Sequence, residues 1–546
     1  MHVDTAVSHQ RGKTYTRHLL RHSYREDGKV KKRTLANLSH CTDEEIAAIK
    51  LALQHKGDLS VLGTVDDVTV VEGHRVGAVF CLNAVAHRLG IPEVLGAHRQ
   101  GRLALWQILA RLMDQGSRLS SVRLAGRHAA CEILGLDAFH EDHLYPNLAW
   151  LAERQAAIEQ RLFRRRYGAA PPQLFLYDVT SSYLEGVENL LAAFGYNRDG
   201  KQGKKQLVIG LLTAPDGGPV AVRVFAGNTP DTQTVATQVQ ILARQFGVEE
   251  VTLVGDRGML KQPQIERLAD AHFHYITAIT KPQIRTLLTQ EVLQLDLFDE
   301  AVCEVEHEAV RYVLRRNPVR AEEMAQSRTA RLASLRARVE EQNRYLAEHP
   351  RARVEVAQRK LNERNQRYKL AGFATVEVTE RTFSLTLDKE AREAAAELDG
   401  CYVIKTDLAD ALASAQQIHD RYKDLAEVER AFRTFKTGHL EARPVFVRSE
   451  ESTRGHVFVV MLAYLIEREL SRCWRELDTT VAEGIDELGS LRGSIVQIGA
   501  TSCQKVPQPT GLAQQLLDAA QVQLPEVLPV RKVEVVTRKK LPSRRK

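Results

Sequence analysis

The sequence contains no uninterrupted apolar stretch long enough to span a bilayer, and its first residues, MHVDTAVSHQRGK, lack the hydrophobic segment of a signal peptide. Cysteine is also scarce: the seven cysteines form no CxxC pair and no Cys–His cluster, and they lie far apart at positions 41, 81, 131, 303, 401, 473 and 503. A disulfide framework and a zinc ribbon are therefore not expected. The simplest interpretation is a cytoplasmic protein without a membrane partner.

The length and the charge distribution are more informative. A chain of 546 residues with 44% apolar residues has room for two to four domains with ordinary cores. Residues 531–546 carry a net charge of +7 and residues 1–35 carry +6, so the remaining 495 residues sum to −6. Basic ends on a nearly neutral body fit contacts to nucleic-acid phosphates. For the C-terminal end, a solvated tail that is disordered at its tip remains an equal alternative.

Three acidic residues, far apart in the sequence, each have a specific local setting. Asp178 lies inside the strand-like run LFLYDVTSSY, and Asp256 ends a second run, EEVTLVGDRG. Glu429 lies in the helix-like segment 422–436. Two carboxylates at strand ends and one on a later helix can converge on a pair of divalent metal ions, which is the apparatus of phosphodiester chemistry.

Each of these residues also has an ordinary explanation when it is considered alone. Asp178, which precedes Val-Thr-Ser-Ser, and Asp256, which precedes Arg-Gly, would be turn or cap residues, and Glu429 would belong to a solvated helix face. The metal-binding interpretation depends on all three residues occurring in order and in suitable elements.

The order of the expected elements supports convergence. Pro171-Pro172 marks a boundary, after which three strands follow as a meander around 174–183, 207–214 and 218–227. A helix at about 232–246, for which Asp231 is a natural N-cap, leads to the strand that ends at Asp256. A helix at 261–271 and a strand at 274–279 follow.

With these elements, the chain resembles a DDE-type insertion-sequence transposase with an RNase H-like catalytic core. One large group of such enzymes carries the signature Tyr-x2-Arg-x3-Glu-x6-Lys, and Tyr422, Glu429 and Lys436 stand at those spacings. Leu425 occupies the position of the signature Arg. Arg430 and Arg433 flank Glu429 and are candidates to replace the missing cation.

The resemblance implies a DNA transposase that binds terminal inverted repeats, cleaves at the element ends and joins 3′-hydroxyls to target DNA. It implies two Mg²⁺ ions, for which Mn²⁺ can substitute, with Asp178 bridging them and Asp256 and Glu429 each holding one. Its partners would be end and target DNA and a second copy in a homodimeric synaptic complex, on the bacterial nucleoid. An RNase H-like nuclease without strand transfer, and an inactive DNA-binding protein, remain alternatives.

Several basic residues are expected to contact DNA. Around Glu429, Tyr422 lies two helical turns before and Lys436 two turns after it on one helix, and both are candidates for backbone contacts, with Arg430 and Arg433. Lys201, Lys204 and Lys205 form a basic loop after the first strand. Asp27-Gly28 predicts a hairpin turn near the N-terminus, lined by Arg21, Arg25, Lys29, Lys31 and Arg33. This hairpin is either a ribbon for a DNA groove or a small solvated hairpin.

The expected fold is α/β: an RNase H-like mixed sheet core with a large insertion before the last catalytic helix, preceded by a helix-rich N-terminal DNA-binding region. We expect the following segments: a basic β-hairpin (1–45), a helical DNA-binding region (46–168), the first part of the core (169–284), an insertion with strands and a helical hairpin (285–395), the second part of the core (396–475) and a C-terminal region with a basic tail (476–546). The insertion explains why 172 residues separate Asp256 from Glu429.

Overall fold

The computed structural model describes residues 1–10, 13–57, 68–168, 170–186, 188–196, 200–201, 203–436, 440–443, 447–498, 501–531, 533 and 535–538. It divides into two compact units. One contains Met1–Arg88, Leu95–Leu144 and Glu469–Lys546, and the other contains Leu89–Val94 and Tyr145–Arg468. The segment boundaries expected from the sequence are finer than this division and stay predictions.

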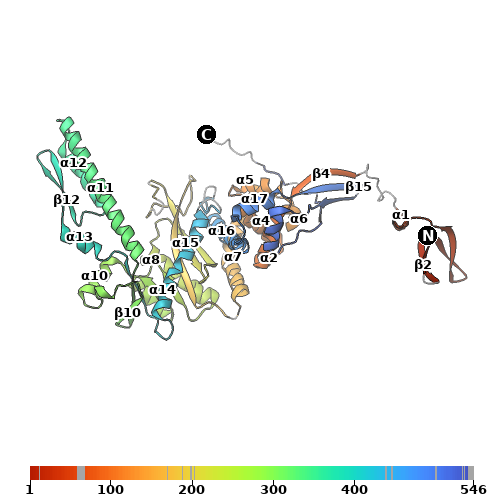
Figure 1. Ribbon diagram of the computed structural model, residues 1–546, viewed down its shortest axis with the longest axis horizontal. Coiled ribbons are helices and arrows are strands. Elements are labelled where there is room, and N and C mark those ends of the chain that lie inside the picture. Colours follow the sequence, from red (N-terminus) through yellow and green to blue (C-terminus); the bar gives the residue numbers. More distant parts are fainter. Residues whose placement is uncertain are drawn as a thin grey trace. The chain divides into compact units, whose positions relative to one another are not determined.

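The second unit is built on a large mixed sheet, and the expectation of an α/β fold is confirmed (Figure 1). Its eight strands lie in the order β10-β11-β14-β9-β8-β5-β6-β7. Strand β5 runs parallel to β8, and β8 runs parallel to β9, while the other neighbours are antiparallel. The bounds are β5 (Leu174–Tyr183), β6 (Gln206–Thr213), β7 (Pro219–Ala226), β8 (Thr252–Gly255), β9 (His274–Ala278), β10 (Cys303–His307), β11 (Val310–Arg316) and β14 (Cys401–Thr406).

Helices cover both faces of this sheet. One face packs against a cluster that includes Phe163 of α7 (Glu141–Tyr167), Val235 of α8 (Asp231–Gln240) and Leu268 of α9 (Gln262–Asp270). On the other face, α15 (Leu425–Lys436) contacts β5 and β6, and α14 (Ala415–Lys423) contacts β9 and β14. Strands covered on both sides are almost wholly buried, which is why β6 reads as a continuous apolar run rather than an alternating one.

Two helices of the second unit cross closely at a glycine. A Cβ atom on Gly455 of α16 (Glu450–Cys473) would lie 2.0 Å from the carbonyl oxygen of Leu148 in α7. Only a residue without a side chain permits this approach, and it fixes α16 against α7. Phe435 of α15 in turn contacts Tyr464 of α16. The helix that carries Glu429 therefore rests on a packed layer.

The segment between Asp256 and Glu429 forms two distinct structures. Strands β10 and β11 do not belong to a separate body, because β11 pairs with β14 and extends the main sheet. After β11, α11 (Pro318–Glu348) and α12 (Val354–Arg367) form a helical hairpin that packs against the two-stranded sheet of β12 (Ala374–Thr379) and β13 (Thr382–Leu387). The remaining elements here are η3 (Ile241–Phe246), α10 (Lys281–Thr289), η4 (Leu295–Leu297) and α13 (Lys389–Ala396).

The first unit joins both ends of the chain. Strand β4 (Val68–Arg75) pairs with β15 (Arg492–Ile498), which continues to β16 (Thr501–Lys505) and β17 (Val527–Pro529). Its helices include α2 (Gly77–Arg88), α4 (Arg99–Met113), α5 (Arg118–Ala125), α6 (Ala130–Leu134), α17 (Val481–Ser490) and α18 (Gly511–Ala519); α3 (Ile91–Leu95) belongs to the second unit except for Leu95. The sequence analysis did not predict β4 or its pairing.

The N-terminal sheet has three strands rather than two. Strand β2 (Lys13–Glu26) turns at Asp27-Gly28 into β3 (Lys29–Asn37), as the turn signal predicts, and β1 (His2–Gln10) adds a further strand on the other side of β2. Helix α1 (Asp43–Gln54) follows, and Thr42 and Glu45 close it with a reciprocal capping box.

Two local expectations need correction. The segment 422–436 is not one helix, because α14 ends at Lys423 and α15 begins at Leu425. The N-cap of α8 is Pro230, so Asp231 is the first helical residue and not the cap. The beginning of the basic C-terminal end is anchored, since Arg531 donates hydrogen bonds to the carbonyl oxygens of Cys131 and Leu136. Among the described residues, no helix is long and apolar enough to cross a membrane.

Candidate active site

The strand register places Asp178 and Asp256 side by side. Tyr177 of β5 pairs with Gly255, the last residue of β8, so Asp178 in β5 and Asp256 directly after β8 lie at the same level of the sheet. Side chains alternate along a strand. Phe175, Tyr177 and Val179 point into the core beneath α7 and α8, so Asp178 faces the opposite side, where α15 lies.

Helix α15 brings Glu429 to the same place. Its buried residues, Val428, Ala431, Phe432 and Phe435, recur at helical spacing and hold the helix on β5 and β6. Glu429 follows the buried Val428 at the edge of this apolar stripe and is itself exposed. The apolar face of the helix thus decides where the carboxylate points.

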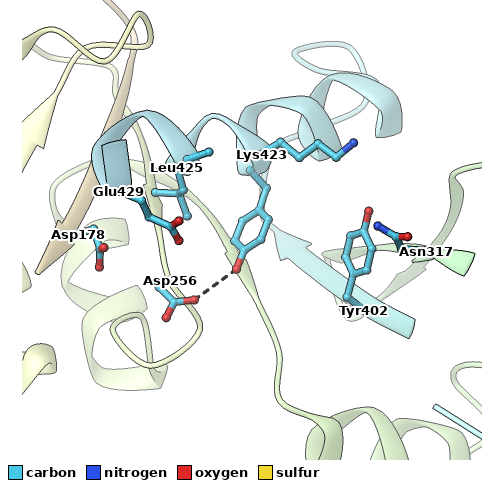
Figure 2. Close-up of a pocket in the computed structure, with 9 residues that line it drawn as sticks. Asp178, Asp256, Asn317, Tyr402, Lys423, Leu425 and Glu429 are labelled. Atoms are coloured by element: carbon cyan, nitrogen blue, oxygen red, sulfur yellow. Dashed lines mark hydrogen bonds between the residues drawn. The ribbon is translucent and has the colours of Figure 1, made fainter. Parts of the chain in front are cut away.

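The three carboxylates line one open cavity of about 410 Å³. Figure 2 shows Asp178, Asp256 and Glu429 at one end of it, with Tyr402 and Asn317 at the other. The structure thus brings together the three acidic residues that the sequence predicts to converge. The full lining is Asp178, Asp256, Asn317, Tyr402, Tyr422, Lys423, Leu425, Ala426 and Glu429.

Hydrogen bonds orient two of the carboxylates. Asp178 Oδ1 accepts from the backbone N–H of Val179 at 2.7 Å, and Asp256 Oδ1 accepts from that of Arg257 at 2.8 Å. The Tyr422 hydroxyl also donates to Asp256 Oδ1, at 3.4 Å (Figure 2). Burial and the neighbouring Asp256 raise the pKa of Tyr422 well above its usual range, so the hydroxyl stays a donor.

The donor set fits a hard divalent cation in kind. All three side chains offer carboxylate oxygens, and Oδ2 of Asp256 has no hydrogen-bond partner among the described residues. No three His, Cys, Asp or Glu side chains in the described part of the chain are close enough to form a ready-made cluster. The arrangement is open, which suits Mg²⁺, because this ion keeps several waters and takes substrate phosphate oxygens as ligands.

Three polar residues of the cavity were missed in the sequence analysis. Asn317 caps α11 by accepting from the backbone N–H of Arg320, and Tyr402 of β14 is hydrogen-bonded through its hydroxyl to His419 Nε2 at 2.6 Å. Lys423 directly follows the signature tyrosine, and this adjacency is the one signal that could have indicated it. Asn317 and Tyr402 had no such signal, because pairing of β11 with β14 brings them here.

The other signature positions lie around the cavity with different surroundings. Leu425 lines it, and no arginine takes its place in the lining. Arg430 is exposed and forms an ion pair with Glu427 at 3.0 Å. Arg433 is exposed and Lys436 half-buried on α15, outside the cavity lining. Their contacts with DNA remain predictions.

The remaining basic candidates do not line this cavity. Lys201 lies over the ring of Tyr183 at 5.8 Å. Lys204 and Lys205 are exposed and directly precede β6 in the sequence. Part of that loop, residues 197–199 and Gln202, lies outside the described residues. In the N-terminal sheet, Arg21 forms an ion pair with Asp4 and Lys31 with Glu26, while Arg25 and Arg33 are exposed.

The comparisons with known proteins agree with this geometry. Residues 170–466, more than half of the chain, match the family described as transposase DDE domain, so the chain belongs to the DDE transposases. Residues 5–60 match the family described as IS1634 family transposase, N-terminal domain. The protein is therefore a DNA transposase of the DDE-type insertion-sequence class.

More distant comparisons add little. A solved structure described as the cryo-EM structure of a piggyBac transposase synaptic complex with hairpin DNA is similar, with 7% identity and a TM-score of 0.35. The match covers 71% of this chain and 69% of that one. No curated protein matches the chain.

Proposed function

We propose that this transposase binds the terminal inverted repeats of its own element, cleaves the DNA at those ends and joins the 3′-hydroxyls to target DNA. The observation that carries the proposal is the convergence of Asp178, Asp256 and Glu429 on one open cavity. We interpret the sheet order, with β5 between the antiparallel β6 and the parallel β8, as an RNase H-like core.

Each carboxylate has a distinct proposed role. Asp178, on β5, would contribute a ligand to each of two Mg²⁺ ions, and Asp256 and Glu429 would each help to hold one of them; Mn²⁺ could substitute. When bound, such a pair activates the attacking oxygen and stabilises the leaving oxygen of a phosphodiester. The backbone N–H groups of Val179 and Arg257 keep the two aspartates in their orientations.

The residues around the cavity would hold the DNA. Lys423 is exposed at its edge and can contact a phosphate near the reacting one. Lys436, Arg433, Arg430, Lys201, Lys204 and Lys205 are proposed to follow the backbone further away. Phosphate contacts position DNA without reading its sequence, so recognition of the repeats is assigned to residues 1–165. We propose a homodimer in the synaptic complex, which acts on nucleoid DNA.

Replacing single carboxylates tests the proposal. Asp178→Asn, Asp256→Asn and Glu429→Gln each preserve shape but remove a metal ligand, so each should abolish cleavage of end DNA in Mg²⁺ while leaving binding within about twofold. Glu427→Gln, on the same helix but outside the cavity lining, is the matched control and should cleave normally. Near-normal cleavage by one of the three variants would remove that residue from the site.

A nuclease without strand transfer is the second candidate, because the same carboxylates serve hydrolysis. Incubation of pre-cleaved ends with a circular target separates the two. Joined products indicate a transposase, whereas cleavage without joining indicates a nuclease. An inactive DNA-binding protein would give neither product.

A further inference from the structure

Two further cavities continue from the catalytic one along the same edge of the sheet. A cavity of about 200 Å³ shares Asp256, Tyr402 and Tyr422 with it. A third, of about 370 Å³, shares Arg257, Ala278 and Ile279 with the second. Because neighbouring cavities share lining residues, the three define a path from the catalytic carboxylates past Asp256 and Arg257.

The charge along this path changes sign. The catalytic end carries three carboxylates, whereas the third cavity is lined by Arg257, Lys261 and Lys405 and by no acidic residue. Among the described residues, none of these three cations has a carboxylate within salt-bridge distance. Lys281, between them and the catalytic site, is by contrast neutralised by Asp399 at 3.6 Å.

Lys405 is the most informative of the three cations. It lies on β14, is half-buried, and its nitrogen lies 5.8 Å from the centre of the Tyr275 ring. Burial lowers its pKa from the usual value, because the ammonium is desolvated without a compensating carboxylate. A half-buried ammonium in an acid-free cavity would be stabilised by an anion from outside the chain.

The backbone also contributes positive charge to the third cavity. Helix α9 begins at Gln262 on the wall of this cavity, and its N-cap residue, Lys261, makes no side-chain capping hydrogen bond. The neighbouring α10 is different, because Thr280 and Gln283 close its N-terminus with a capping box. The positive end of the α9 dipole is thus left for another partner.

We propose that the cavity of Arg257, Lys261 and Lys405 binds one backbone phosphate of the DNA strand that passes through the catalytic cavity. This inference rests on the proposed function. The carboxylates, with metal ions bound, would hold the reacting phosphate, and the basic cavity would bind another phosphate of the same strand. Two fixed points on one strand set its direction across the site, so these residues are positioning residues rather than catalytic ones.

The test removes the charge from each side of the proposed contact. The probe is duplex DNA of the element's own end, with single neutral methylphosphonates placed at successive positions of the cleaved strand. In the wild-type protein, one position should weaken binding about tenfold. In Lys261→Ala and in Lys405→Gln the same substitution should cost less than about twofold, because the partner is already gone. The salt dependence of binding should also fall by about one counterion.

Matched controls keep the outcome decisive. Arg267→Ala removes an exposed cation from the far end of the same helix, and it should respond to every methylphosphonate as the wild type does. Lys261 is exposed, so its variant tests the proposal even if Lys405→Gln folds poorly. If wild-type protein cleaves the probe but both variants keep the full methylphosphonate response, the phosphate site is wrong. If the wild type neither binds nor cleaves, the proposed function itself fails.

A free anion is the other source of the same chemistry. Thermal unfolding with inorganic phosphate alone, in the absence of DNA, separates the two sources. Stabilisation of the wild type by millimolar phosphate, without any coupling to methylphosphonates, would assign the cavity to a free anion and overturn the strand contact.

Discussion

At the scale of single residues, the site depends on how each carboxylate is oriented. Asp178 and Asp256 are each held by the backbone N–H of the next residue, and this arrangement needs no other side chain. Tyr422 adds a third contact, but at 3.4 Å it is a long hydrogen bond and therefore a weak one.

We expect Tyr422→Phe to keep cleavage within about tenfold of the wild type, since it removes only this weak bond and leaves the ring in place. The loss should appear mainly as a higher Mg²⁺ concentration for half-maximal cleavage, because Asp256 loses orientation. A magnesium titration at saturating DNA measures this. An unchanged Mg²⁺ requirement with weaker DNA binding would instead indicate that the hydroxyl contacts DNA.

A second prediction concerns pH. Burial raises the pKa of Glu467 on α16 to about 7, and Arg468 only partly offsets this. The folded state therefore binds a proton that the unfolded state has already released, and stability falls as pH rises from about 4.5 to about 7. Glu467→Gln removes the ionisation and should stabilise the protein at pH 8 by about 1–2 kcal/mol more than at pH 5.

Chemical unfolding at the two pH values, with Glu450→Gln in the first turn of the same helix as control, measures the difference. Equal gains at both pH values would show that Glu467 is not buried as an acid.

At the scale of elements, strand alternation separates the basic residues of the N-terminal sheet. Arg33 pairs with His22 and Lys31 with Tyr24, so these four side chains share one face, where the rings of His22 and Tyr24 stack. Arg21 and Arg25 lie on the other face. Each face holds one ion pair, Arg21 with Asp4 and Lys31 with Glu26. Because the stacked rings lie on the face of Arg33, we take that face as the better candidate for DNA.

We therefore expect Arg33→Ala to weaken binding of end DNA about tenfold, and Arg25→Ala to change it less than about twofold. Both residues are exposed arginines on paired strands, so each is a control for the other. Competition binding of full-length protein against scrambled DNA measures the effect. An equal loss in both variants would mean that DNA binding depends on the total charge of the sheet and not on which face carries it.

At the scale of the whole molecule, the two ends of the chain depend on each other. Strand β4 has β15 as its sheet neighbour, α17 packs on α2 and α4, and the indole N–H of Trp474 donates to the carbonyl of Leu516. A chain that ends at Leu491 would lose β15–β17 and α18. We expect such a chain to be digested within residues 68–144 by limited proteolysis, while the unit of residues 145–468 resists.

A chain that ends at Arg538 is the control, because it lacks only residues 539–546, and it should resist digestion like the full chain. Resistance of the shorter chain would show that the helices of the first unit fold without their C-terminal partners.

The sequence by itself predicted that the three carboxylates converge. It also predicted the order of strands and helices around them and the helical hairpin of the insertion. Each of these depends on a local signal: an apolar strand that ends in an acid, a helical period, or a proline such as Pro350 between two helices. Such patterns span only a few residues, because backbone hydrogen bonding and side-chain alternation act over that range.

Only the tertiary structure decided the rest. The pairing of β4 with β15, the entry of Asn317 and Tyr402 into the cavity and the basic cavity of Lys261 and Lys405 all join residues that are far apart in the sequence. Arg75 pairs with Arg492, Asn317 lies 61 residues after Asp256, and Lys405 lies 144 residues after Lys261. The break between α14 and α15 at Asp424 also escaped the helical pattern, since packing on different strands overrides local propensity. Contacts of this kind depend on how the buried faces of helices and strands fit together. A single sequence does not show which of these faces will pack against each other.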